Sequence, residues 1–249
     1  MILELDEVTV TFTSGPPFAR RVLRAMRDVS LQVAAGETLG LVGESGSGKT
    51  TTSRVALGLR RPDSGTVRFD GRPFPRRRRR LAGRMQAVLQ HPDWSLNPRM
   101  RVGQSVAEPL HVLGGASRAG AAEKVRRMLE EVGLEPELAR RYPHELSGGQ
   151  RQRVSIARAL ITRPGFIVFD EAVSALDVSV QAQILNLIKD LQDEFGFGAL
   201  FISHDLGAVR YVADRIAVMR AGEVVETAAT ETFYTGPSHA YSKQLLEAL

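Results

Sequence analysis

The sequence contains no cysteine among its 249 residues. Without thiols the chain forms no disulfides, thiolate-bound zinc or cysteine-ligated iron-sulfur clusters, and we expect no redox chemistry. This composition is compatible with a reducing cytosol. A chain of this length buries a substantial core, and we expect it to fold without covalent cross-links.

Long apolar runs are also missing. No stretch approaches the roughly 20 residues that a helix needs to cross a bilayer. The chain opens directly with an alternating run over residues 2–6, rather than with a basic segment followed by an apolar one. We therefore expect a soluble chain that reaches a membrane only through partner proteins.

Aromatic residues are absent from the most basic stretch. The net charge is +5, and much of the excess comes from the five consecutive arginines Arg76 to Arg80, which follow a breaker-rich segment at 71–75. The simplest interpretation is a solvated loop between two strands, and contact with lipid phosphates or nucleic acid is the alternative. A stacking surface for nucleic acid needs aromatic side chains between the basic ones. We therefore do not expect nucleic acid among the partners.

Apolar periodicity places strands and helices along the chain. Short or alternating apolar runs predict strands at residues 3–12, 29–33, 37–42, 66–69, 87–89, 166–169, 199–202, 215–219 and 224–226. Helical spacing predicts helices at residues 53–59, within 102–133, at 150–162, at 179–195 and from about residue 240. Ser117 is a candidate N-cap and Gly133 a candidate helix end. The pattern indicates an α/β protein with a β-rich N-terminal part and a helical middle.

A glycine-rich loop separates the run at 37–42 from the helix at 53–59. It fits the pattern G-x-x-x-x-G-K-[ST], in which glycines let backbone N–H groups converge on phosphate oxygens and the following helix adds its positive end. Lys49 then supplies charge to the outer phosphates, and Thr50 offers a hydroxyl to Mg²⁺, which prefers hard oxygen ligands. The predicted nucleotide contacts here are Gly43, Glu44, Ser45, Gly46, Ser47, Gly48, Lys49, Thr50 and Thr51.

Two carboxylates, Asp170 and Glu171, directly follow the apolar run at 166–169. A nucleotide site needs a second contact to the metal, and Asp170 is suited to orient the Mg²⁺ shell. Glu171 is better suited to polarise an attacking water beside the γ-phosphate. The alternative is a pair of exposed acids at a strand end.

A second glycine motif runs from Leu146 to Gln150. Ser147 can donate a hydroxyl hydrogen bond, while Gly148 and Gly149 expose backbone N–H groups at the start of the following helix. Together they make a second phosphate cradle. One nucleotide cannot easily occupy two such cradles within one chain.

The order of these motifs resembles the nucleotide-binding subunit of ABC transporters, and the resemblance covers essentially the whole chain. It implies a P-loop NTPase fold of the ABC cassette type, with a mixed central sheet, an N-terminal antiparallel β subdomain and an α-helical signature subdomain. Within this single domain, residues 1–90 and 164–230 correspond to the catalytic core with its β subdomain. Residues 91–163 correspond to the helical signature subdomain, and 231–249 to a C-terminal helical tail.

The resemblance also implies roles for single residues. Gln90 corresponds to the Q-loop glutamine, His204 to the switch histidine at the γ-phosphate, and Asp177 to the end of the D-loop at 174–177. The implied catalytic residues are Glu171, His204 and Gln90, and the implied metal ligands are Thr50, Gln90 and Asp170. The signature contacts to nucleotide are Ser147, Gly148, Gly149 and Gln150, to which Asp177 is added.

An aromatic residue that stacks on adenine completes the implied set. Phe12, at the end of the first predicted strand, is the best match. Phe18 is a rival because the segment at 13–27 is long. An ordinary core phenylalanine is the alternative interpretation of Phe12.

The resemblance further implies a dimer of cassettes, in which each ATP lies between the Walker A loop of one subunit and the signature of its partner. ATP with Mg²⁺ closes the dimer, hydrolysis opens it, and the Q-loop region passes the movement to two integral membrane permease subunits. An extracytoplasmic solute-binding protein is an indirect partner. The chain is then expected at the cytoplasmic face of the cell membrane, in a homodimer or in a heterodimer with a paralogue.

Two segments look like the peptide and nickel importer branch of the family: residues 91–100, with Ser95 to Pro98 as the better marker, and the tail at 236–246. The tail departs from that branch at Ala240, where proline is usual. The leading hypothesis is therefore an importer ATPase for peptides, dipeptides or nickel. The alternative is a soluble ABC ATPase in a complex for phosphonate breakdown, or for nucleic-acid or translation remodelling. The cargo itself is not encoded in these residues.

Overall fold

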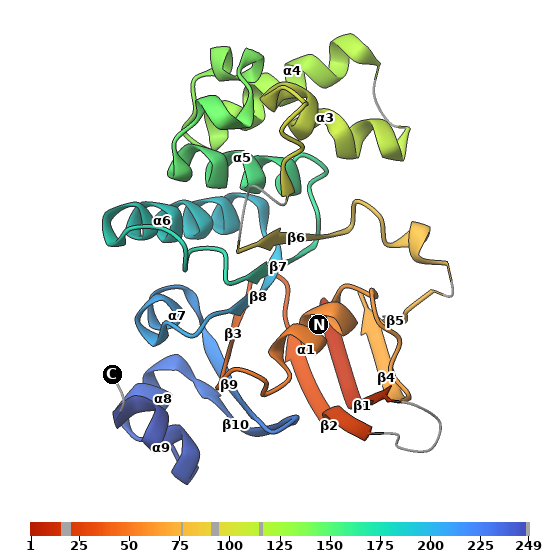
Figure 1. Cartoon of the computed structure of the whole chain (residues 1–249), viewed down its shortest axis with the longest axis vertical. Helices are drawn as coiled ribbons and strands as arrows, with labels where there is room; N and C mark the ends of the chain where they lie inside the picture. Colours follow the sequence, from red (N-terminus) through yellow and green to blue (C-terminus); the bar gives the residue numbers. More distant parts are fainter. Residues whose placement is uncertain (16–20, 76, 91–94, 115–116, 248–249) are drawn as a thin grey trace. The chain divides into compact units, whose positions relative to one another are not determined.

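A computed structural model describes residues 1–15, 21–75, 77–90, 95–114 and 117–247 of the chain (Figure 1). The chain divides into two compact units. The first unit consists of Met1–Arg78 together with Gly198–Leu249, and the second of Arg79–Phe197. The predicted helical segment at 91–163 lies within the second unit, which also contains strands and a further helix.

The first unit contains an antiparallel sheet in the order β2-β1-β4-β5. Its strands are β1 (Leu3–Ser14), β2 (Arg21–Val33), β4 (Ser64–Phe69) and β5 (Arg72–Pro73). In β1 the buried side chains Leu3, Leu5, Val8 and Val10 form the inner face. β2 begins earlier than the strand predicted at 29–33. The prediction missed its first part because the first four residues are all exposed and carry no alternating apolar pattern.

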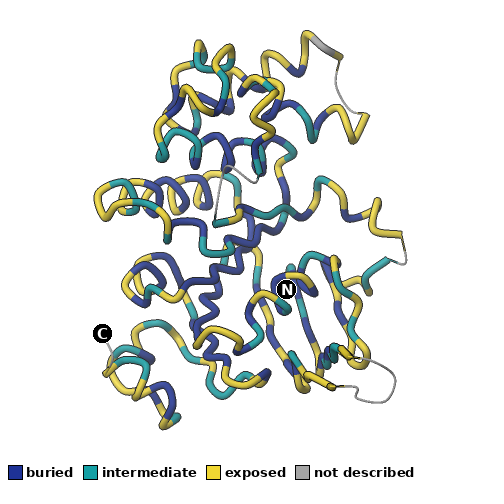
Figure 2. The backbone as a smooth tube through the Cα atoms, viewed as in Figure 1, coloured by how far each residue is buried: buried dark blue, intermediate teal, exposed yellow. Residues whose placement is uncertain are grey.

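The first unit also contains four strands of a mixed sheet, in the order β10-β9-β3-β8. Its members are β3 (Thr38–Val42), β8 (Gly198–Ile202), β9 (Arg215–Arg220) and β10 (Glu223–Ala229). β3 is parallel to both β8 and β9, while β10 is antiparallel to β9. Every residue of β3 and β8 is buried, as the dark tube in Figure 2 shows. This is typical of strands covered on both faces.

The helices of the first unit are α1 (Lys49–Ala56), α7 (Leu206–Val212), α8 (Thr230–Thr235) and α9 (Ala240–Glu247). The predicted helix at 53–59 was wrong at both ends. α1 starts directly after the glycine loop and stops before Gly58, whose φ of +64° takes the chain out of the helix. α7 and α8 were missed because helices of 7 and 6 residues are too short to show a helical period.

The second unit pairs two parallel strands, β6 (Met85–Leu89) and β7 (Phe166–Asp170), and contains four helices within its described part. These are α3 (Val102–Leu113), α4 (Arg118–Glu131), α5 (Gly148–Leu160) and α6 (Val178–Phe195). The 3₁₀ turns Pro136–Arg140 and Pro143–Glu145 connect α4 to α5. Both predicted helix signals are confirmed, because the Ser117 hydroxyl accepts the N–H of Gly120 at 3.2 Å and Gly133 has a φ of +69°.

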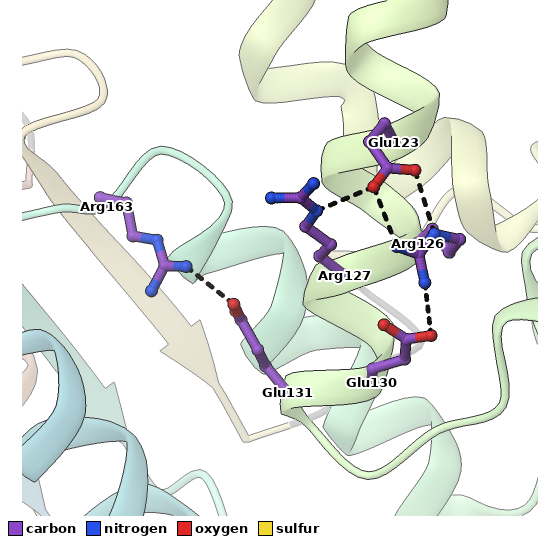
Figure 3. Close-up of polar contacts among 6 residues, drawn as sticks. All are labelled: Glu123, Arg126, Arg127, Glu130, Glu131 and Arg163. Atoms are coloured by element: carbon purple, nitrogen blue, oxygen red, sulfur yellow. Dashed lines mark hydrogen bonds and ion pairs between the residues drawn. The ribbon is translucent and has the colours of Figure 1, made fainter.

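The exposed face of α4 carries a network of ion pairs (Figure 3). Arg126 bridges Glu123, at 2.9 Å, and Glu130, at 2.6 Å, and Arg127 also contacts Glu123 at 2.8 Å. Hydrogen bonds from the two arginines lower the pKa of Glu123 to about 2. Arg163 reaches Glu131 at 2.8 Å. The network gives α4 a charged outer surface opposite its apolar positions.

The described arginines of the run, at 77–80, are exposed and lie between β5 and β6, as expected for a solvated segment between two strands. Arg76 lies outside the described residues, and Arg78–Arg80 form an exposed 3₁₀ turn. The Arg78 guanidinium donates a hydrogen bond to the backbone carbonyl of Leu59, so at least one of these arginines has a structural contact. In the described part of the chain, no helix combines the length and apolar character that a membrane span requires.

Candidate functional site

The loop after β3 has a backbone shape that only glycine allows. Gly43 has a φ of +148° and Gly48 a φ of +115°. A Cβ on Gly43 would lie 2.1 Å from the carbonyl oxygen of Met219 in β9, and one on Gly48 would lie 2.4 Å from that of Ala25 in β2. The loop therefore packs against the two sheets of the first unit more closely than any residue with a Cβ would allow.

The opposite side of the loop is open. Gly46 has a φ of +80°, and no described atom lies within 4 Å of the position of its missing Cβ. α1 begins with Gly48 as its N-cap, which has no side chain to bond the first N–H groups, and no acidic residue follows in the first turn. The Ser47 hydroxyl is buried and has no hydrogen-bond partner among the described residues. A phosphate chain fits this combination of an open loop backbone, a buried hydroxyl and a helix N-terminus.

Lys49 lies against the loop that it follows. Its side chain is buried, and its Nζ donates to the carbonyl oxygens of Gly43, at 2.6 Å, and Glu44, at 2.8 Å. Thr50 is exposed, and Thr51 is half-buried. The nine predicted residues therefore run through the loop and into the first turn of α1, and the Lys49 ammonium is held against the start of the loop.

His204 leaves the same sheet edge as the loop. Leu41 pairs with Ile202 in the parallel register of β3 and β8, so the segments that follow both strands start side by side. His204 itself is exposed. Its neighbour Asp205 is fixed, because its carboxylate caps α7 by accepting the N–H of Ala208 at 3.0 Å.

In the second unit, three predicted segments meet where β6 and β7 end: the Q-loop at Gln90, the two carboxylates at 170–171 and the D-loop at 174–177. Asp170 ends β7 opposite Leu89, and Glu171 follows with a φ of +52°, which is strained for a residue other than glycine. The Ser174 hydroxyl donates to the Glu171 carbonyl at 3.0 Å and accepts from Nε2 of Gln90 at 3.1 Å. Ser174 thus connects Gln90 to the backbone of Glu171. No sequence signal identified this role, because a single serine hydroxyl has no distinctive pattern.

Asp177 has a structural contact of its own. Its carboxylate accepts the Val180 N–H at 3.0 Å and the Ser179 hydroxyl at 2.8 Å, which makes it the N-cap of α6 and lowers the pKa of Asp177. Its contact with nucleotide stays a prediction.

The signature residues form a capping box at the start of α5. The Ser147 hydroxyl accepts the Gln150 N–H at 3.2 Å, and the Gln150 side chain accepts the Ser147 N–H at 2.9 Å. A Cβ on Gly148 would make an ordinary contact with Leu176 at 3.8 Å, whereas one on Gly149 would lie only 2.7 Å from Val180. The helix start is therefore preformed, and Gly149 is also needed for the close approach of α5 to α6.

Phe12 lies in β1 and is half-buried, with the Arg60 guanidinium 5.1 Å from its ring centroid. Phe18 lies outside the described residues. One residue near the loop was missed altogether by the sequence. The hydroxyl of Tyr241, in α9, accepts the Glu44 N–H at 3.1 Å. The sequence predicts this tail as a helix and as a marker of a family branch, and neither prediction indicates a contact with the loop.

Comparison with known proteins identifies related chains. A family model described as ABC transporter matches residues 26–174. A Brucella abortus (strain 2308) protein, provisionally named a peptide import ATP-binding protein, is 49% identical over 255 residues, covering 100% of this chain and 76% of the relative. A Brucella ovis protein with the same provisional name is 48% identical over 231 residues, covering 91% of this chain and 73% of the relative.

Solved structures give the same result. The structure of cbiO1 from Clostridium perfringens, part of the ABC transporter complex cbiONQ, has a TM-score of 0.84 at 26% identity and covers 94% of this chain and 90% of that chain. The ATP-binding cassette MJ0796, in a dimeric post-hydrolysis state bound to ADP and Pi, has a TM-score of 0.78 at 29% identity, covering 92% of this chain and 98% of that chain. These likenesses confirm the predicted cassette fold, and the chain belongs to the ABC transporter family.

Proposed function

We propose that this chain is the ATP-hydrolysing subunit of an ABC importer for peptides, with dipeptides and nickel as further candidates for the cargo. The observation that carries the proposal is the preformed loop from Gly43 to Lys49, whose N–H groups and buried ammonium suit a nucleotide polyphosphate. The provisional names of the Brucella relatives support the import of peptides. Ser95 to Pro98 and the tail at 236–246 agree with the same branch.

In this function the first unit binds the phosphates. The backbone of the loop and Lys49 contact the outer phosphates, Phe12 stacks on the adenine, and His204 contacts the γ-phosphate. Thr50, Gln90 and Asp170 would hold Mg²⁺, since hydroxyl, amide and carboxylate oxygens are the ligands that this ion prefers. When bound, Mg²⁺ neutralises charge that develops on the phosphate oxygens.

Hydrolysis requires a positioned acceptor for a proton of the attacking water. We assign this role to Glu171, and Gln90 orients the water with it. The left-handed backbone of Glu171 and the hydrogen bond from Ser174 to its carbonyl support the assignment. Backbone strain of this kind clusters at active sites, where surrounding contacts hold it in place.

The signature residues Ser147 to Gln150, with Asp177, act on the nucleotide of a second cassette. The dimeric state of cassette MJ0796 with ADP and Pi supports such an arrangement. The partners are then a second copy or a paralogue, two integral membrane permeases and, indirectly, an extracytoplasmic solute-binding protein. The chain would work at the cytoplasmic face of the cell membrane.

Two substitutions test the ATPase. Glu171→Gln keeps the size of the side chain but removes the proton acceptor, so ATP binding should persist while turnover falls to background. Lys49→Ala removes the charge at the loop and should weaken ATP binding itself. Binding is measured by calorimetry and turnover by phosphate release. Turnover by Glu171→Gln at the rate of the parent chain would refute the assignment.

The transport role is tested by purification from membranes. An importer subunit should co-purify with two integral membrane proteins, and deleting it should abolish uptake of labelled peptides. Recovery with soluble enzymes alone would instead favour the phosphonate-breakdown or remodelling alternative.

A further inference from the structure

One peptide group of the phosphate loop is held at both ends. The carbonyl oxygen of Gly43 accepts the Lys49 ammonium at 2.6 Å, and the N–H of the same peptide, which belongs to Glu44, donates to the Tyr241 hydroxyl at 3.1 Å. Tyr241 is 197 positions away in the sequence but lies in the same unit. The orientation of this peptide therefore depends on a residue of the C-terminal helix α9.

The Tyr241 side chain is itself fixed. It is only 2% exposed, and the Arg220 guanidinium lies 4.6 Å from its ring centroid. Burial raises the pKa of Tyr241, so the hydroxyl stays neutral at ordinary pH. A neutral hydroxyl accepts the Glu44 N–H without placing a negative charge beside the phosphate site.

The start of α9 is anchored independently of the loop. The Glu226 carboxylate, in β10, accepts the Ser238 N–H at 2.7 Å, the Ser238 hydroxyl at 2.8 Å and the His239 N–H at 3.0 Å. His239 Nδ1 in turn accepts the Tyr241 N–H at 3.1 Å. These bonds attach the tail to β10, and α8, which precedes α9, packs against β9 and β10 (Figure 1). Tyr241 is thus presented to the loop by a rigid support.

The peptide needs such a support because of its position. Gly43, with a φ of +148°, lacks the Cβ that restricts rotation in other residues, so the peptide that follows it flips at low cost unless it is held. In the proposed function Lys49 turns towards the outer phosphates of the nucleotide and releases the Gly43 carbonyl. The bond to Tyr241 is independent of that movement.

We propose that Tyr241 is a positioning residue for the ATPase: its hydroxyl fixes the Gly43–Glu44 peptide so that the phosphate loop is preformed when nucleotide arrives. This inference rests on the proposed function, because it assigns Tyr241 to the nucleotide site. It adds the C-terminal helix to the parts of the chain that set nucleotide affinity.

The test compares Tyr241→Phe with a matched control. Phenylalanine keeps the ring and its contact with Arg220 but removes the hydroxyl. The control is Tyr234→Phe in α8, because Tyr234 also lies near an arginine, Arg210 at 5.0 Å, and donates its hydroxyl to a backbone carbonyl, that of Leu206. Both variants lose one hydrogen bond, but only Tyr241→Phe loses one to the phosphate loop.

Affinities for ADP and ATP are measured by calorimetry on the whole chain. We expect Tyr241→Phe to bind both nucleotides roughly 2- to 10-fold more weakly, the range for one neutral hydrogen bond. Tyr234→Phe should bind as the parent does. Amide exchange followed by mass spectrometry adds a readout that is independent of turnover: the Glu44 N–H should exchange faster in Tyr241→Phe and at the parental rate in the control.

The outcomes separate the two proposals. If the parent chain binds ATP, Lys49→Ala weakens it, and Tyr241→Phe binds as the parent does, only the positioning role is overturned. Equal losses of affinity in Tyr241→Phe and Tyr234→Phe would also overturn it, because they would indicate general destabilisation of the tail. If the parent chain binds no ATP, the proposed function and this inference fail together.

Discussion

Ser174→Ala is the substitution that most directly tests how the catalytic carboxylate is held. The hydroxyl of Ser174 donates to the Glu171 carbonyl at 3.0 Å and accepts from Gln90 at 3.1 Å, so its removal breaks two hydrogen bonds at once. The Ser174 N–H, 3.3 Å from the same carbonyl, remains in the variant. Glu171 is therefore loosened but not released.

The magnitude follows from these contacts. One neutral hydrogen bond contributes about 0.5–1.5 kcal/mol, so the two contribute about 1–3 kcal/mol together. The left-handed backbone of Glu171 costs about 1–3 kcal/mol, which is similar to the free energy that the two hydrogen bonds contribute. Without these bonds, Glu171 relaxes towards an ordinary φ. Ser174 is half-buried and water replaces part of the loss, which favours the lower half of the range. We expect kcat to fall about 5- to 30-fold.

The assay is steady-state ATP hydrolysis, together with ATP affinity by calorimetry. The expected result is a lower kcat with ATP affinity within about 2-fold of the parent, since binding depends mainly on the phosphate loop. Ser179→Ala is the matched control, because the Ser179 hydroxyl donates to the carboxylate of Asp177, at 2.8 Å, and its removal leaves both bonds of the Ser174 hydroxyl in place. A kcat for Ser174→Ala equal to that of the control would refute the reasoning.

Two further predictions concern the signature helix and the tail. Gly149→Ala places a Cβ 2.7 Å from Val180 and should lower the unfolding temperature, whereas Gly148→Ala should not. Both variants should leave ATP binding by the isolated chain intact. A loss of ATP binding as large as that in Lys49→Ala would contradict the assignment of the signature to a partner's nucleotide. Burial raises the pKa of Glu226, but favourable interactions with Ser242, Ser238 and His239 outweigh it and hold the pKa at about 2, below the ordinary 4.5. A depressed carboxyl pKa contributes stability that is fully present above 4.5 and is lost as the pH falls towards 2. The difference in unfolding temperature between the parent and Glu226→Gln should therefore shrink from pH 7 to pH 3, and a difference that grew on acidification would contradict it.

The sequence predicted the parts of the site that depend on local backbone chemistry. The loop from Gly43 was recognisable because its positions of positive φ require glycine, and β3 and β7 because their apolar runs are fully buried strands. The sequence predicts Ser147 to Gln150 as a phosphate cradle rather than as a capping box, although the spacing of a capping box is also local. These features need no knowledge of distant contacts.

Contacts between remote segments could not be predicted in this way. Gln90 and Ser174 are 84 positions apart, and Glu44 and Tyr241 are 197 apart, so no local period relates them. The predicted start of α1 was wrong because the helix begins directly after the glycine loop, at Lys49, where the apolar spacing has not yet begun. The assignment of adenine stacking to Phe12 stays a prediction, and its contact with Arg60 shows that one partner of the ring is already a side chain of the protein.

Several predicted nucleotide contacts already have partners within the protein. Lys49 bonds two carbonyls of its own loop, Asp177 caps α6, and Ser147 caps α5. A phosphate that binds Lys49 therefore replaces two hydrogen bonds rather than meeting an unbonded ammonium, and the affinity reflects the difference between the two states. The carboxylate of Asp177 and the hydroxyl of Ser147 keep acceptor or donor capacity beyond their caps, so they can add a ligand without giving up a helix end. Nucleotide affinity should consequently depend on how the loop backbone is held as well as on the charge of Lys49, which is why the peptide between Gly43 and Glu44 is the group to measure.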